Sequence, residues 1–268
     1  MRLSNIEVLV STMYQNPSEL YLVEKMNIKT DAIIINQTDS YGYIEKKLNN
    51  DANVKMYSFN EKGVGKSRNN ALLRANKDIC LMADDDVVYV NNYEQIIQKA
   101  YLKYPDADFI VFNVRIHEKG KTSVGNYKEG RVKWYNSLRY GTVRFSFKRK
   151  SVLKENIFFS LLFGGGAKYG SGEDSLFIWE ALKRNLNVYV VNDVIADVYN
   201  DESSWFEGYN EKFFMDKGAL YKALSSNFYM FFSIRFLLKN KKKFNDSFTF
   251  FEKMRMMKKG AFKYSNLR

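Results

Sequence analysis

The feature that most constrains the fold is an alternation of strand-like and helix-like segments along most of the chain. A β-α-β-α order with short connections is typical of an α/β fold, in which helices flank a mainly parallel central sheet. Ligands of open α/β sheets bind beyond the carboxyl ends of the strands, so the loops after the strands are the expected binding sites. Strands are expected over 7–11, 32–35, 54–59, 78–83 and 109–114, and helices over 18–26 (with Ser18 as N-cap), 66–75, 93–104 and 175–184.

The composition excludes several classes of protein and of active site. With 46% hydrophobic residues the chain is not intrinsically disordered, and its single cysteine, Cys80, excludes a disulfide framework or a zinc ribbon. His117 is the only histidine and lies in a polar segment, so a Ser-His-Asp or Cys-His relay is not expected. No apolar run reaches the roughly 20 residues that cross a bilayer, and no signal-peptide pattern is present, so a cytoplasmic protein is expected. The chemistry should therefore come from carboxylates, from a metal held by oxygen ligands, or from basic side chains.

The formal net charge of +12 is unevenly distributed along the chain. Residues 226–268 hold 11 Lys and Arg against two acids, which is a net charge of +9. We therefore expect two units, a nearly neutral domain over 1–225 and a basic, Phe-rich helical extension over 226–268. Basic residues next to bulky apolar ones suit a helix on an anionic membrane surface. An extension that packs its Phe face on the domain and leaves its lysines in solvent is the open alternative.

Three aspartates, Asp84, Asp85 and Asp86, follow the strand expected over 78–83. Neighbouring carboxylates repel one another and need a compensating cation, and Mg²⁺ or Mn²⁺ prefers such oxygen ligands. Taken alone, the same residues are also explained as a solvated acidic turn.

Two glycine-containing segments precede expected helices. The first, 63–68, matches the end of a P-loop, but Asn60 stands where a P-loop requires its first glycine. It is therefore either an anion-binding turn or a plain strand-to-helix turn. The second has five glycines within 164–172, followed by Glu173 and Asp174 at the start of a helix. Such a loop is expected where the backbone approaches a ligand closely or moves as a lid. One of the two acids would then be a general base. Alternatively, both acids only interact favourably with the positive end of the helix dipole.

The order and spacing of these segments resemble family 2 glycosyltransferases of the GT-A fold, in particular bacterial enzymes that build capsule, lipopolysaccharide or other surface polysaccharides. The resemblance covers about residues 5–215. It rests on the strand that ends in Ser11 and Thr12, on the segments 35–39 and 65–70, on the aspartate triplet at the D-x-D position, and on 173–174 at the ED position.

The resemblance implies roles for the residues that match in the donor site. Thr12 and Asp39 would line the base pocket of a nucleotide-sugar, and Arg68 would lie near the base and the diphosphate. Asp84 would contact the ribose, with Asp85 beside it among the donor-binding residues. Asp86 would hold the Mn²⁺ or Mg²⁺ ion that bridges the diphosphate and stabilises the leaving group.

The resemblance also implies roles on the acceptor side. Asp174 would be the base that deprotonates the acceptor hydroxyl, giving inversion at the anomeric carbon, and its choice over Glu173 rests on the resemblance. Some relatives supply a late histidine to the metal, which Asp197 or water would replace here. The candidate residues for the acceptor or the sugar are Gly165, Gly166, Glu173 and Trp205, of which Trp205 is equally explained as a core residue.

The expected partners are a UDP-sugar donor and a saccharide acceptor carried by a lipid such as undecaprenyl. We also expect residues 226–268 to contact the inner face of the cell membrane, the chain to form a homodimer, and nucleic acid not to bind. Two alternatives are a non-enzymatic basic module that binds nucleic acid through basic and aromatic side chains, and an inactive transferase-fold scaffold for a partner enzyme.

Overall fold

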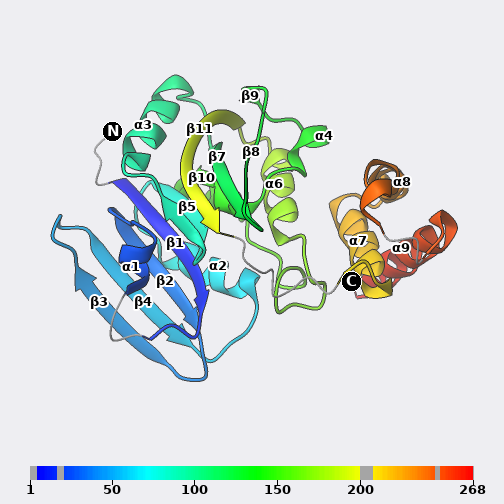
Figure 1. Cartoon of the computed structure of the whole chain (residues 1–268), viewed down its shortest axis with the longest axis horizontal. Coiled ribbons are helices and arrows are strands. Elements are labelled where there is room, and N and C mark those ends of the chain that lie inside the picture. Colours follow the sequence, from blue (N-terminus) through cyan, green and yellow to red (C-terminus); the bar gives the residue numbers. More distant parts are fainter. Residues whose placement is uncertain (1–4, 17–20, 200–207, 245–247, 268) are drawn as a thin grey trace.

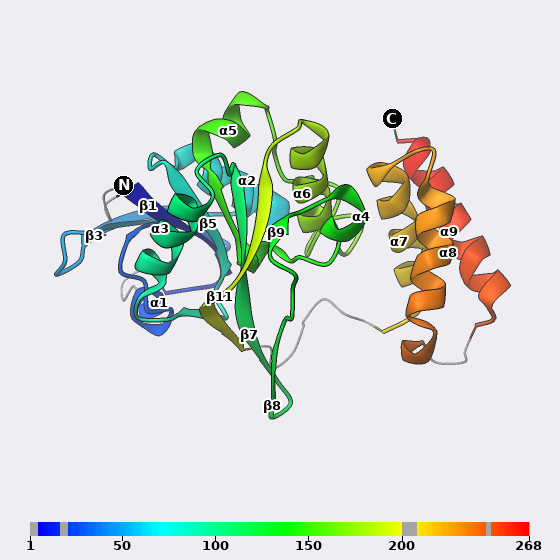
Figure 2. The ribbon, with the colours of Figure 1, turned by 90° about the horizontal axis from the view of Figure 1, so that it is seen from above.

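The computed structural model describes residues 5–16, 21–199, 208–244 and 248–267, which form an α/β body followed by three long helices (Figures 1 and 2). The expected N-cap Ser18 lies outside these residues. Within them, every strand and helix expected from the sequence is present, with its ends shifted by a few residues. The strands are β1 (Ile6–Met13), β2 (Asp31–Gln37), β3 (Gly42–Lys47), β4 (Asn53–Phe59), β5 (Ile79–Asp84), β6 (Val87–Tyr89), β7 (Phe109–Glu118), β8 (Lys121–Val124), β9 (Gly130–Arg131), β10 (Phe145–Lys148) and β11 (Val188–Tyr199).

The strands form one mixed sheet with the main order β3-β4-β2-β1-β5-β10-β7-β11-β6. Its first half has a parallel core, because β1 pairs in parallel with both β2 and β5, and β2 pairs in parallel with β4. β10 lies antiparallel between β5 and β7. The carboxyl ends of β2, β1 and β5 therefore meet at one edge of the sheet, where a ligand is expected.

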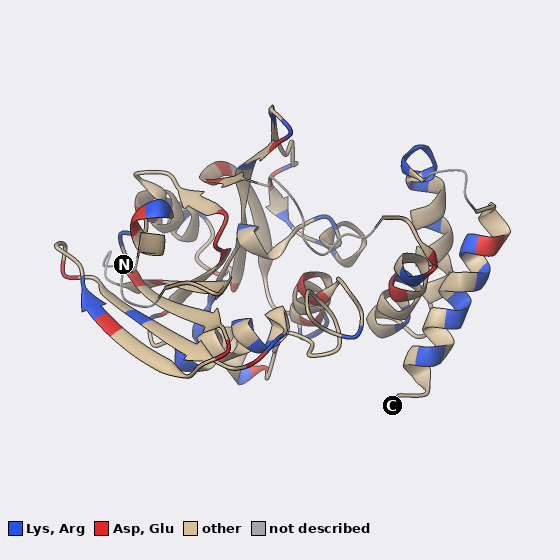
Figure 3. Ribbon diagram, turned by 60° about the horizontal axis from the view of Figure 1, so that its bottom comes forward, with Lys and Arg blue, Asp and Glu red and all other residues tan. Residues whose placement is uncertain are grey.

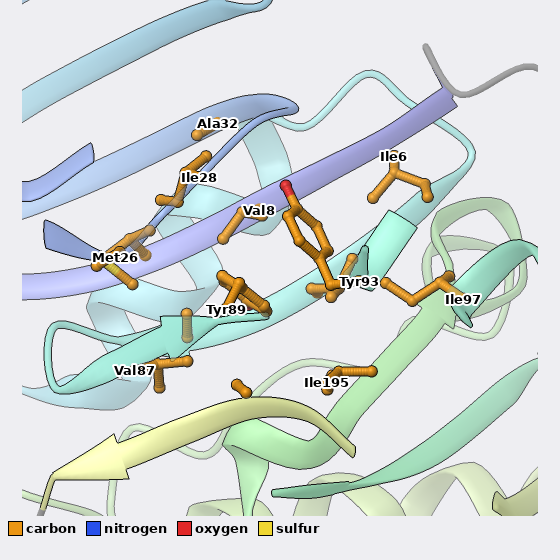
Figure 4. Packing of buried hydrophobic residues seen from close by; sticks show 14 of the residues in the cluster. Ile6, Val8, Met26, Ile28, Ala32, Val87, Tyr89, Tyr93, Ile97 and Ile195 are labelled. Carbon is orange, nitrogen blue, oxygen red and sulfur yellow. The ribbon is translucent and has the colours of Figure 1, made fainter. Parts of the chain in front are cut away.

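Helices cover both faces of the sheet, which confirms the predicted α/β class (Figure 2). The helices of the body are α1 (Tyr21–Lys25), α2 (Val64–Arg74), α3 (Tyr93–Lys103), α4 (Trp134–Ser137), α5 (Arg149–Lys154) and α6 (Glu173–Lys183), with a 3₁₀ turn, η2 (Thr142–Arg144). Val8 and Val10 of β1 pack with α1 and α3, whereas Leu9 packs with α2, α5 and α6 on the opposite face. Figure 4 shows the first of these two clusters.

The burial of both faces explains why the central strands are almost continuously apolar. Seven of the eight residues of β1 and six of the seven residues of β2 are buried. β3, at the edge of the sheet, is mostly exposed and polar. The hydrophobic runs in the sequence therefore mark the centre of the sheet.

The three C-terminal helices, α7 (Glu211–Leu224), α8 (Tyr229–Lys239) and α9 (Phe250–Ser265), pack with one another and carry the short turn η3 (Lys241–Lys243). α7 and α9 cross in backbone contact, because a Cβ added at Gly218 would lie 1.9 Å from the carbonyl oxygen of Met257. A Cβ at Gly260 would lie equally close to the carbonyl oxygen of Met215. The expected boundary between residues 225 and 226 falls between α7 and α8, inside this three-helix unit.

The three-helix unit is joined to the body by an aromatic core. Phe163, Tyr169 and Trp179 of the body share a hydrophobic cluster with residues of α7, α8 and α9, including Phe214 and Phe232. In Figure 3 the same helices carry many more basic than acidic positions. None of the helices in the described part of the chain combines the length and apolar content that a bilayer crossing needs.

Candidate active site

The candidate site lies at the carboxyl ends of β1 and β5, where segments far apart in the sequence meet. Ser11 of β1 is in register with Asp84 of β5. Helix α2, which follows β4, brings Arg68 to this edge, and the start of α6 brings Glu173. The structure thus places four of the predicted segments side by side.

Arg68 is the centre of this arrangement and is only 4% exposed. Its Nη1 donates to Glu173 Oε1 at 2.7 Å, and its Nη2 donates to both carboxylate oxygens of Asp84 at 3.0 and 3.1 Å. The Phe159 ring lies 5.5 Å from its guanidinium carbon. Burial disfavours the charge of Arg68, but the two carboxylates outweigh burial and raise its pKa. The Arg68 guanidinium is therefore engaged by the protein's own acids, beside the place expected for the diphosphate.

The other two aspartates of the triplet differ in their partners. The Thr12 hydroxyl donates to Asp85 Oδ2, so these two predicted donor-binding residues contact each other. Asp86 Oδ1 is buried and has no hydrogen-bond partner among the described residues. Burial, then the charges of Asp84 and Asp85, raise the pKa of Asp86 to about 6. An unpaired oxygen in a negative environment is the electrostatic situation that a bound cation would relieve.

The described residues hold no group of three or more His, Cys, Asp or Glu side chains arranged around a metal position. Mg²⁺ and Mn²⁺ are often held by one or two carboxylates together with substrate phosphates. The unpaired oxygen of Asp86 fits a site of this kind, in which a diphosphate provides the remaining ligands.

Glu173 and Asp174 are neighbours in the first turn of α6, but their environments differ. Glu173 is nearly buried, accepts from Arg68, and also accepts from the backbone N–H of Gly172. Asp174 is partly exposed, and its Oδ1 accepts from the backbone N–H of Ser175 at 2.6 Å. Burial, then the charge of Glu173, raise the pKa of Asp174 to about 6. Asp174 is thus the acid of this pair that no side-chain cation binds within the described residues.

The glycine-rich loop packs against the start of α2. The Val64 N–H donates to Gly165 O at 3.0 Å, so this amide, which was a candidate for binding an anion, has a partner in the protein. A Cβ on Gly166 would lie 3.1 Å from the backbone nitrogen of Gly63. Gly164 has φ +107°, and a Cβ there would lie 2.8 Å from Glu173 Oε2. These glycines are required by close contacts within the chain, which is a sufficient reason for their presence.

Three further candidates are not part of this cluster. Asp39 is exposed in the turn after β2 and makes no hydrogen bond or ion pair with the cluster in the described ranges. Trp205 lies outside the described residues. Asp197 accepts from Arg115 at 2.6 and 2.7 Å and contacts His117, and these interactions lower its pKa to about 2. Its carboxylate is therefore not free to replace a metal-binding histidine.

Lys217 of α7 interacts electrostatically with both acids, Glu173 and Asp174, and no sequence motif marks it. Burial lowers the pKa of Lys217, while Asp174 and Glu173 act in the opposite direction. A helix after the predicted site thus supplies a cation near the candidate base.

Comparison with known proteins identifies the family and the fold. The family model described as glycosyl transferase family 2 matches residues 28–162, half of the chain. No curated protein matches the sequence. Among solved structures, S. aureus TarS 1–349 in complex with UDP-GlcNAc is similar, with 17% identity, a TM-score of 0.58, and coverage of 82% of this chain and 66% of that one. Full-length S. aureus TarS has 16% identity, a TM-score of 0.56, and coverage of 81% and 39%.

These similarities establish the fold. The GT-A fold predicted from the sequence is confirmed, with a helical C-terminal region. The chain spans less than two thirds of the length of the TarS structures that it matches, 65% of the 1–349 fragment in one case.

The buried ion pairs of Arg68 give a stability prediction. Arg68→Met keeps an apolar stem but leaves Asp84 and Glu173 unpaired, and should lower the free energy of unfolding by about 3 kcal/mol. Urea denaturation followed by circular dichroism measures this change. Lys66→Met, on the exposed side of the same helix, is the control and should stay within about 0.5 kcal/mol of the unchanged protein. Equal stability of the two variants would show that the Arg68 pairs do not hold the site together.

Proposed function

The chain belongs to glycosyl transferase family 2, and on this premise we propose that it transfers a sugar from a nucleoside-diphosphate sugar to a hydroxyl of a saccharide acceptor, with inversion at the anomeric carbon. A UDP-sugar is the proposed donor. The similar TarS structures, which contain UDP-GlcNAc or UDP, support this choice, as does the presence of the aspartate triplet at the carboxyl end of β5.

The observation that carries the proposal is that two adjacent acids, Glu173 and Asp174, lie in different electrostatic environments. Arg68 forms an ion pair with Glu173, whereas Asp174 forms no side-chain ion pair among the described residues, and burial raises the pKa of Asp174 to about 6. A general base works best when its pKa lies near the working pH, because it is then deprotonated yet basic enough to take a proton. Asp174 meets this requirement, whereas the Glu173 carboxylate is held in an ion pair with Arg68.

The proposed reaction is a single displacement. Asp174 takes the proton of the acceptor hydroxyl while the acceptor oxygen forms its bond to the anomeric carbon. The bond from that carbon to the diphosphate oxygen breaks, and the nucleoside diphosphate leaves with the electron pair. Asp174 holds the proton until it is released to solvent.

We propose that Asp86, with the donor diphosphate, holds Mn²⁺ or Mg²⁺. The unpaired buried oxygen of Asp86 supports this assignment. A cation there would neutralise the negative charge that develops on the leaving diphosphate. Asp84, fixed by Arg68, and Asp85, held by Thr12, would remain to bind the ribose and orient the donor.

Asp174→Asn tests the base. The variant should lose about 10³-fold in sugar transfer while its affinity for UDP-GlcNAc stays unchanged, because an amide cannot accept the proton. For the unchanged protein, transfer should rise as the pH increases through about 6. Release of UDP measures transfer, and calorimetry measures donor binding. Asp193→Asn, at an exposed position in β11, is the control.

The same variant has a predicted effect on stability. The folded-state pKa of Asp174 lies above the ordinary value of 3.8, so its contribution to stability is complete below pH 3.8 and is lost as the pH rises through about 6. Asn does not ionise, so Asp174→Asn should melt on the order of 3 °C higher at pH 7.5. Normal transfer by the variant would contradict the role of Asp174. Absence of transfer by the unchanged protein with every nucleotide-sugar would favour the inactive scaffold.

Asp86→Asn tests the cation. Mn²⁺ together with UDP-GlcNAc should raise the Tm of the unchanged protein on the order of 5 °C above the value with the nucleotide-sugar alone. Asp86→Asn should lose this metal-dependent part. Asp51→Asn makes the same substitution in an exposed turn and should keep the metal-dependent part of the Tm shift. Retention of the full metal-dependent shift by Asp86→Asn would overturn the assignment.

We also propose that α8 docks on an anionic membrane surface and that the acceptor is lipid-linked, as in the synthesis of bacterial surface polysaccharides. Phe228, Phe231 and Leu238 are 63%, 55% and 62% exposed on and next to α8. Three exposed lysines follow in η3. Exposed apolar residues next to several cations suit a membrane interface, because apolar burial and attraction to anionic lipid then act together.

Vesicle sedimentation tests the docking. Phe228→Ser with Leu238→Ser should reduce binding to vesicles of mixed anionic and zwitterionic lipid at least fivefold, because it removes apolar area from α8. Leu73→Ser with Leu102→Ser removes similarly exposed leucines from the body and is the control. Equal binding of the two double variants, or no binding by the unchanged protein, would contradict docking through α8.

A further inference from the structure

A cavity of about 340 Å³ lies between the body and the three-helix unit. Its walls come from α4 and the start of α6 on one side and from α7 and α8 on the other, elements that face each other in Figures 1 and 2. The volume is in the range of small-ligand sites. Ser175 and Lys217 line the cavity, and Ser175 follows the candidate base Asp174 in the chain. The cavity therefore reaches the residue next to Asp174, although Asp174 itself is not among the lining residues.

The charge of the cavity has one sign. Arg139, Lys217, Arg235 and Lys239 line it, and no Asp or Glu does so among the residues that the structure describes. Within these residues, no ion pair joins Arg139, Arg235 or Lys239 to an acid, and Lys217 donates to the Ser171 hydroxyl at 3.2 Å. Four cations around one space repel each other, and an anion placed between them would relieve that repulsion.

Aromatic rings form much of the remaining wall. Trp134, Tyr135 and Phe231 are each more than half exposed, and they line the cavity. Trp134 is held edge-to-face against Trp179, with the ring centroids 6.3 Å apart. Exposed, supported rings of this kind bind apolar chains or the faces of sugar rings.

The three aspartates at the end of β5 do not line the cavity. The diphosphate of the donor belongs with those aspartates in the proposed function, so the cationic cavity needs a different anion. The reaction has only one other substrate, the acceptor.

We propose that this cavity binds a phosphate group of the acceptor and thereby presents the acceptor hydroxyl to Asp174. The inference rests on the proposed function and adds the substrate class: an acceptor that carries a phosphate ester. The phosphate can come from the diphosphate that links a saccharide to its lipid, or from a phosphorylated saccharide without lipid. Aromatic rings beside the cations suit the first source through the apolar chain and the second through the sugar ring.

Calorimetry with the full chain tests the proposal, with farnesyl diphosphate, glucose 1-phosphate and uncharged farnesol as probes. Farnesyl diphosphate should bind, and Arg139→Gln with Arg235→Gln should weaken its binding at least tenfold. Arg255→Gln with Lys258→Gln removes the same charge from the exposed side of α9 and should leave binding unchanged. Tighter binding of farnesyl diphosphate than of glucose 1-phosphate would identify the lipid-linked acceptor as the source of the phosphate. Tighter binding of glucose 1-phosphate would identify the phosphorylated saccharide.

Three results would overturn the proposal. They are farnesol binding as tightly as farnesyl diphosphate, equal affinity of the two double variants for the phosphate probes, and displacement of a bound probe by UDP-GlcNAc. Arg139 and Arg235 are exposed, so the fold should survive their replacement. If the melting temperature nevertheless falls, Lys239→Gln in α8 replaces the double variant in the same titrations.

The outcome separates this proposal from the proposed function. If the cavity proposal alone fails, UDP-GlcNAc still binds and is turned over, while the phosphate probes do not distinguish Arg139→Gln with Arg235→Gln from its control. If the proposed function fails, no nucleotide-sugar binds or is turned over by any variant, whatever the phosphate probes do.

Discussion

The ion pairs of Arg68 are the interaction on which the rest of the site depends. A buried guanidinium is stable only when its charge is compensated, and Arg68 of α2 finds Asp84 at the end of β5 and Glu173 at the start of α6. These pairs tie three elements together at the carboxyl edge of the sheet. They also separate the acids of the site into two kinds. Asp84 and Glu173 form ion pairs with Arg68, whereas burial raises the pKa of Asp86 and of Asp174.

Close backbone packing completes the site around Arg68. Gly164 and Gly166 let the loop before α6 reach Glu173 and the turn before α2, and Gly218 with Gly260 lets α7 and α9 cross in contact. α7 in turn brings Lys217 beside Asp174. The C-terminal helices therefore form one wall of the cavity that we propose as the acceptor site, and they carry the exposed basic residues that raise the net charge.

The sequence predicts the sheet and the acidic motifs well, for identifiable reasons. Continuous apolar runs such as the one in β2 follow directly from burial on both faces, and the acidic motifs lie at the end of β5 and in the first turn of α6. The sequence does not reveal pairings between distant segments. The engagement of Arg68 by Glu173, the packing role of Gly166 and the antiparallel insertion of β10 depend on three-dimensional contacts. The cationic cavity is lined by helices from α4 to α8, which lie far apart in the sequence, so no local sequence pattern marks it.

The central claim is that Arg68 binds Glu173 and so leaves Asp174 as the unpaired acid. A double-mutant cycle of Arg68→Met and Glu173→Gln, measured by urea unfolding at pH 7, tests it most directly. Because the two groups are buried and joined at 2.7 Å, the coupling free energy should be on the order of 2 kcal/mol. A coupling free energy near zero, with the two single effects simply adding, would contradict the account.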